Sequence, residues 1–235
     1  MTELPRDLDS CRPSRRVILA TAASLFAAPA CAERLFDICA ADGTPLRNFA
    51  VDPALSPSRL AGLIETGGGN ISRASPLLVE FFDYACGPCH RAAPEIEALL
   101  VLAPELRLGL AQHPVLGSGS IAAAKVALAA QNLVGDDAAF RLHRALLQAP
   151  GPASAEKALA LADAQGLNRA ELEQAAASEV IAKSIAAHGQ RARDLSLAQT
   201  PSFVLAGFAF VGWPGVEPLL AFLVALRNCG GLACP

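Results

Sequence analysis

The sequence is poor in charge and in aromatic side chains. Of its 235 residues, 17% are charged and 5% are aromatic, and there is a single Trp and a single Tyr. The formal net charge is −3, so the chain has no basic field that would attract nucleic acid. We find no internal repeat, which excludes repeat architectures, and no low-complexity tract beyond a richness in alanine. What remains is a globular chain, 53% apolar, with enough residues for one sizeable core.

The apolar run near the N-terminus is too short to span a bilayer comfortably. It extends from Val17 to Ala30, follows Arg15 and Arg16, and ends at the small-x-small pattern Ala30-Cys31-Ala32. The segment is similar to a bacterial twin-arginine signal. We expect residues 1–32 to be a signal peptide that directs export to the bacterial periplasm. The alternatives are a buried or membrane-anchoring helix and a lipoprotein whose lipid is attached to Cys31.

Cysteines outside this segment are few, and their number is odd. Export implies an oxidising compartment, in which thiol pairs are meaningful. At least one thiol must therefore stay unpaired or pair outside the chain. Cys229 and Cys234 bracket two glycines, which predicts a local structural disulfide, with pairing of Cys39 to either one as the alternative. The five are Cys39, Cys86, Cys89, Cys229 and Cys234.

The first half of the chain predicts a strand, a helix and a second strand. We interpret residues 33–70 as an N-terminal extension and linker, because proline and glycine interrupt them repeatedly. Leu77 to Tyr84 is a nearly continuous apolar run that suits a buried central strand. Residues 89–102 then have apolar positions at helical spacing, and residues 106–112 alternate as a strand does.

The second half predicts helices and then a hairpin. Residues 118–195 are helical in character, with Asp136, Ser154 and Asn168 as candidate N-caps, and the segment from Asn168 to Arg191 is predicted as one helix. Residues 202–205 and 208–211 form a strand pair, and a last helix covers 219–227. This order is the skeleton of an α/β thioredoxin fold with a helical insertion at about 118–195, between the βαβ and ββα halves. The pairing of the strands is inferred here by analogy.

The motif Cys86-Gly87-Pro88-Cys89 stands where the central strand meets the start of a helix. A helix N-terminus offers unpaired N–H groups and a partial positive charge, which stabilise a thiolate. We therefore expect the pKa of Cys86 to lie below that of a free thiol and Cys89 to be the inner, resolving thiol. A protonated His90 would stabilise the thiolate further. Pro88 suits an early helical position because it has no N–H to leave unpaired.

The residues around this motif resemble a known family in three separated places. Residues 80–89, Glu-Phe-Phe-Asp-Tyr-Ala-Cys-Gly-Pro-Cys, resemble the active-site segment of the DsbA-like bacterial periplasmic disulfide oxidoreductases. Residues 112–124 look like the strand that leads into that family's helical insertion. Residues 200–207, beginning Thr-Pro-Ser-Phe, resemble its cis-proline strand. The resemblance covers residues 71–228, within a predicted domain of residues 71–235.

The resemblance implies a role for individual residues. Pro201 would be a cis-proline opposite the cysteines, and Thr200 would tune the thiols or contact substrate. Glu80 would be a buried acid that serves proton transfer at Cys89, although a salt-bridged or edge-exposed glutamate is the alternative. The implied activity is thiol–disulfide exchange with exported proteins, with a membrane redox partner and with no cofactor or metal.

Two other interpretations remain open at this point. The inner dipeptide Gly87-Pro88 is that of the reducing thioredoxins, so a reductase or isomerase fits as well as an oxidase. A periplasmic metal-binding module could instead use the two thiolates as soft ligands. His113, His143 and His188 show no ligand pattern, and we expect structural or surface roles for them.

Overall fold

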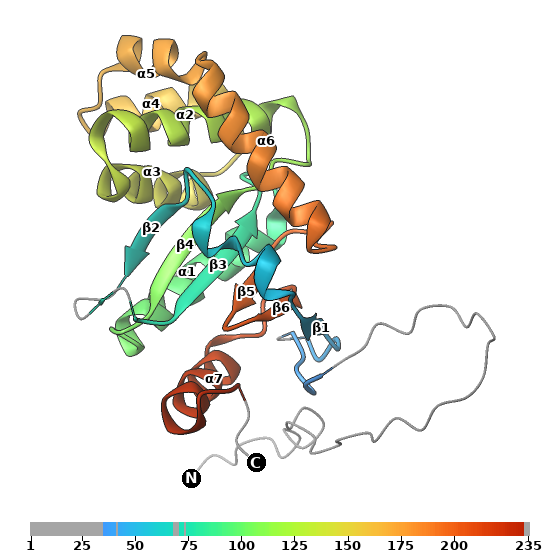
Figure 1. Ribbon diagram of the computed structural model, residues 1–235. Helices are drawn as coiled ribbons and strands as arrows, with labels where there is room; N and C mark the ends of the chain where they lie inside the picture. The colour runs from blue at the N-terminus through green and yellow to red at the C-terminus, as the bar shows by residue number, and fades with distance from the viewer. Residues whose placement is uncertain (1–34, 41, 68–70, 73, 233–235) are drawn as a thin grey trace, which may run out of the picture.

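A mixed β-sheet forms the centre of the structure, a computed structural model that describes residues 35–40, 42–67, 71, 72 and 74–232 (Figure 1). Within these residues the strand order is β1-β6-β5-β3-β4-β2. β3 and β4 are parallel, and every other pair is antiparallel. The strands are β1 (Arg47–Ala50), β2 (Ile64–Gly67), β3 (Leu77–Phe82), β4 (Arg107–Gln112), β5 (Ser202–Leu205) and β6 (Phe208–Val211).

Strand β3 is apolar almost throughout because both of its faces are covered. Leu78 and Phe82 belong to the larger core, which also contains side chains of α1 (Gly87–Leu102) and α7 (Val216–Cys229). Val79 and Phe81 face the opposite way, into a smaller core that includes Ala192 of α6 (Glu179–Asp194). Side chains alternate between the faces of a strand, so Glu80 is directed toward the α1 side with Leu78 and Phe82.

The helices divide into two that flank the strands in sequence and a block inserted between β4 and β5. α1 (Gly87–Leu102) follows β3, and α7 (Val216–Cys229) is the last helix of the described residues. Between β4 and β5 the chain forms the helical block that caps one end of the sheet in Figure 1, with α6 descending along it. The block consists of α2 (Ser118–Val134), α3 (Asp136–Gln148), α4 (Ala155–Asp163), α5 (Arg169–Ala176) and α6 (Glu179–Asp194). The predicted thioredoxin fold with a helical insertion is thus confirmed.

The helix boundaries follow capping chemistry, with two departures from the sequence prediction. Ser154 and Asn168 cap α4 and α5 as expected, each accepting hydrogen bonds from backbone N–H groups. Asp136 is not a cap, because Gly135 takes that position with φ of 104°, a left-handed value that favours glycine. The single helix predicted from residue 168 is divided by Ser178, which caps a new helix through the N–H of Ile181.

The segment interpreted as an extension and linker supplies both edges of the sheet. β1 pairs with β6, and β2 pairs with β4. No strand forms over residues 35–38; instead the buried Asn48 side chain accepts hydrogen bonds from the N–H groups of Leu35 and Phe36. Short polar-punctuated strands have weak periodicity, so the sequence did not reveal them.

Two predictions fall at least partly outside the described residues. The signal segment, residues 1–32, is one of them. Cys39 and Cys229 are each disulfide-bonded, but Cys234, the expected partner of Cys229, lies outside the described residues. In the part of the chain that the structure describes, we find no helix long and apolar enough to cross a membrane.

Candidate active site

Cys86 is the N-cap residue of α1. Its backbone is extended, with φ of −79° and ψ of 110°, and its Sγ accepts a hydrogen bond from the N–H of Cys89 at 3.2 Å. Pro88 occupies the first turn, and α1 continues through Pro94 to Leu102. The motif therefore places one sulfur against the unpaired N–H groups of a helix start.

The second neighbour of this sulfur comes from the far half of the fold. Cys86 Sγ lies 3.2 Å from the carbonyl oxygen of Thr200, and the Thr200–Pro201 peptide bond is cis, as predicted. β5, which follows Pro201, is hydrogen-bonded to β3, which precedes the cysteines. This antiparallel pairing brings two segments together that are over a hundred residues apart in the chain.

The two thiols are free and are shifted in opposite directions. The pKa of Cys86 is lowered to about 6, chiefly by a hydrogen bond from the Cys89 thiol, with further contributions from Thr200 and from the Cys89 N–H. Burial raises the pKa of Cys89, and the neighbouring Cys86 and Glu80 raise it further. Cys86 is therefore the more acidic of the two thiols.

A pocket of about 330 Å³ opens beside Cys86. Cys86 itself is only 3% exposed, but Gly87 and Pro88 beside it are exposed and line the pocket with it. Val115 and Leu116 also line the pocket, and both are large apolar side chains exposed to solvent. In the sequence nothing distinguishes these two from core residues, because only their exposure sets them apart.

Asp83 connects the cysteine loop to this pocket wall. One carboxylate oxygen accepts a hydrogen bond from the N–H of Ala85 at 2.7 Å, and the other accepts one from the N–H of Leu116 at 2.8 Å. The side chain is buried. Asp83 thereby holds the loop before Cys86 and the loop after β4 at a fixed separation.

His90 is engaged on both sides of its ring. Nδ1 lies 2.6 Å from the carbonyl oxygen of Leu147, and Nε2 lies 2.8 Å from that of Tyr84. Through the contact with Leu147, the ring connects α1 to the end of α3.

Glu80 lies behind the cysteines on β3. It is 1% exposed, and neither carboxylate oxygen has a hydrogen-bond partner. Burial raises its pKa to about 8, and the charge of Cys86 adds to the shift. Among the described residues no ion pair involves Glu80, and β3 is not an edge strand, so the alternative of a salt-bridged or edge-exposed glutamate does not apply.

The predicted redox residues Cys86, Cys89, Glu80, Thr200 and Pro201 thus gather around the N-terminus of α1. Among the described residues no cluster of three His, Cys, Asp or Glu side chains could hold a metal ion. The family model of the DSBA-like thioredoxin domain matches residues 77–226. The chain belongs to this family. Its members are thiol:disulfide oxidoreductases, and so is this DsbA-like chain.

Solved structures of DsbA-like and thioredoxin-like proteins are similar to it. A thioredoxin-like oxidoreductase from Silicibacter pomeroyi DSS-3 is 30% identical, with 72% of this chain and 94% of that one covered and a TM-score of 0.65. The thiol-disulfide exchange protein alpha-DsbA2 from Wolbachia pipientis is 27% identical, with 69% and 86% covered and a TM-score of 0.63. BdbD from Bacillus subtilis, at 17% identity, 74% and 96% coverage and a TM-score of 0.62, shares the fold. No curated protein sequence matches the DsbA-like chain.

Proposed function

We propose that this DsbA-like protein is exported to the bacterial periplasm and exchanges disulfides with exported protein substrates through Cys86. The observation that carries the proposal is the position of the Cys86 sulfur, between the Cys89 N–H and the Thr200 carbonyl, with a lowered pKa. A low thiol pKa gives a large thiolate fraction at neutral pH and makes the sulfur a good leaving group.

The proposed cycle starts from the oxidised Cys86–Cys89 pair. A substrate thiolate attacks the Cys86 sulfur, a mixed disulfide forms, and Cys89 leaves as a thiolate. A second thiolate of the substrate then attacks the substrate sulfur that is bonded to Cys86. The substrate acquires a disulfide, and Cys86 leaves as a thiolate. A membrane redox partner accepts the two electrons when it restores the Cys86–Cys89 disulfide.

Other residues assist by position. Glu80 gives its proton to the departing Cys89 thiolate, a task that suits a buried acid whose pKa lies near neutrality. Thr200 and Pro201 present backbone to the substrate beside Cys86. His90 holds α1 against the end of α3 through its two carbonyl contacts.

Cysteine variants of the protein without its predicted signal segment, residues 1–32, test the proposal. Cys86→Ser should abolish disulfide transfer to a reduced model substrate, because the attacked sulfur is gone. Cys89→Ser should accumulate mixed disulfides at Cys86, visible as mass adducts, because the resolving thiol is lost. Full activity in Cys86→Ser would refute the assignment.

The direction of electron flow follows from a redox titration against glutathione. The Gly87-Pro88 dipeptide keeps a reductase as the second candidate. A potential near that of thioredoxin, about −270 mV, would support the reductase, and a much higher potential would support an oxidase.

A further inference from the structure

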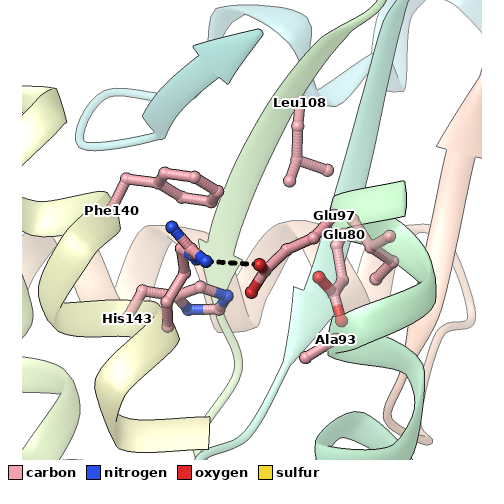
Figure 2. A pocket seen from close by; sticks show the side chains of 8 residues that line it. Glu80, Ala93, Glu97, Leu108, Phe140 and His143 are labelled. Carbon is pink, nitrogen blue, oxygen red and sulfur yellow. Dashed lines mark ion pairs between the residues drawn. The ribbon is translucent and has the colours of Figure 1, made fainter. Parts of the chain in front are cut away.

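A small cavity lies beside Glu80, lined by side chains of β3, β4, α1 and α3 (Figure 2). Its volume is about 10 Å³, which is about what one ordered water molecule requires. Side chains of β3, β4, α1 and α3 meet here, so the cavity stands where the thioredoxin unit contacts the helical insertion. Its walls include Glu80, Ile96, Leu108, Phe140 and His143.

Two polar groups in this apolar enclosure have no hydrogen-bond partner. They are the carboxyl group of Glu80 and Nδ1 of His143. These residues are only 1% and 4% exposed. A buried polar group left unsatisfied costs about 1–3 kcal/mol, and native structures rarely keep two of them around one cavity.

We propose that this cavity binds one ordered water molecule, which hydrogen-bonds to the Glu80 carboxyl group and to Nδ1 of His143. His143 is then a positioning residue that acts on Glu80 through the water. From the sequence, His143 was predicted to be a structural or surface histidine.

The hydrogen-bonding states of the two groups complement each other. Burial raises the pKa of Glu80 to about 8, so at neutral pH the carboxyl group can donate an O–H. Burial lowers the pKa of His143 to about 3, so its imidazole is neutral and has one nitrogen that accepts. A water molecule can accept from the first and donate to the second.

Few charged groups face this cavity. Arg144 of α3 and Glu97 of α1 form an ion pair at its rim, drawn as a dashed line in Figure 2. The charge of Arg144 contributes to the lowered pKa of His143, and that of Cys86 contributes to the raised pKa of Glu80. Both side chains of the ion pair are partly exposed to solvent.

The water would assist one step of the cycle, the transfer of a proton from Glu80 to Cys89, and this consequence rests on the proposed role of Glu80. When Cys89 leaves as a thiolate, Glu80 transfers its proton to that sulfur and becomes a carboxylate. The water can turn and donate a hydrogen bond to the new charge, which lowers the cost of ionising a buried acid. The proton that Glu80 lost returns from solvent through the same water.

The test compares two substitutions of His143 in the otherwise intact protein, with the pKa of Glu80 read from its carboxyl ¹³C resonance. His143→Leu removes the accepting nitrogen, leaves the water with too few partners and should raise the pKa of Glu80 by about one unit or more. His143→Gln retains an accepting oxygen and should keep the pKa near that of the unchanged protein. Phe140→Leu, an apolar change in the same wall, is the matched control.

A Glu80 pKa that moves no further in His143→Leu than in Phe140→Leu would overturn the water site. A high-resolution crystal structure of the unsubstituted protein gives a second answer that needs no variant to fold. Density for a water within about 3.2 Å of both groups supports the site, and its absence overturns it. Disulfide-exchange rates distinguish the two proposals: a shifted Glu80 pKa with unchanged rates would leave the water site standing and remove the role of Glu80.

Discussion

The outer and inner surroundings of the redox pair differ sharply, although Cys86 and Cys89 are only one helical turn apart. The outer region, around Cys86 and Thr200, offers hydrogen-bond donors to a sulfur beside an open pocket. The inner region, around Cys89, Glu80 and His143, is closed and leaves polar atoms without protein partners. The comparison shows how the surroundings of two identical side chains lower the pKa of one thiol and raise the pKa of the other.

The difference between the two thiols should be largest in their rates of alkylation. In the reduced protein at pH 7, iodoacetamide should label Cys86 at least about a hundredfold faster than Cys89, because only Cys86 is mainly a thiolate. Fragment-ion mass spectrometry locates the label. The rate at Cys86 should be halved near pH 6, and equal labelling of the two sulfurs would contradict the contrast.

Glu80→Gln tests the inner region through the pH dependence of stability. The pKa of Glu80 is raised from 4.5 to about 8 on folding, so its stabilising contribution is complete below pH 4.5 and is lost as the pH rises toward 8. Relative to the variant, the unchanged protein should lose up to about 1.4 kcal/mol per pH unit in this window. Denaturant unfolding of the oxidised form measures it, since the two redox thiols then do not titrate.

Glu95→Gln is the matched control for this experiment, since it makes the same chemical change on the exposed surface of α1. The oxygen that accepts from Trp213 can be kept in this variant. A pH profile of Glu80→Gln parallel to that of the unchanged protein would contradict the raised pKa.

Asp83→Ala tests the connection between the cysteine loop and the pocket wall. The N–H groups of Ala85 and Leu116 would lose their acceptor, at a cost of about 1–3 kcal/mol in the free energy of unfolding. Asp83→Asn keeps one accepting oxygen and should lose less. Urea unfolding measures both, and equal stability of Asp83→Ala and the unchanged protein would show that water replaces the carboxylate.

Thr200→Val tests the smallest of these effects, the contribution of one hydroxyl group to the lowered pKa of Cys86. The Thr200 side chain helps to lower the pKa of Cys86, but less than Cys89 does. The midpoint of Cys86 alkylation against pH should therefore rise by less than about one unit. Thr200→Ser keeps the hydroxyl and should leave the midpoint in place, whereas an unshifted midpoint in Thr200→Val would contradict this contribution.

Local sequence patterns were enough to predict most of the helices and strands. The apolar run of β3, the helical spacing after Cys89 and the hairpin before α7 have strong local signals, and all three were predicted near their observed bounds. The edge strands β1 and β2 were not, because their short sequences gain order only from the strands beside them. Ser178, which divides the predicted long helix, is a capping signal that was passed over.

Local sequence is enough to place two cysteines one turn apart at a strand-to-helix junction, because that arrangement involves only neighbouring residues. The surroundings of each sulfur depend on the packing of distant segments. Thr200 reaches Cys86 through strand pairing between β3 and β5, and His143 reaches the Glu80 cavity through the packing of α3 on α1. Such contacts join residues far apart in the chain, and no local periodicity encodes them.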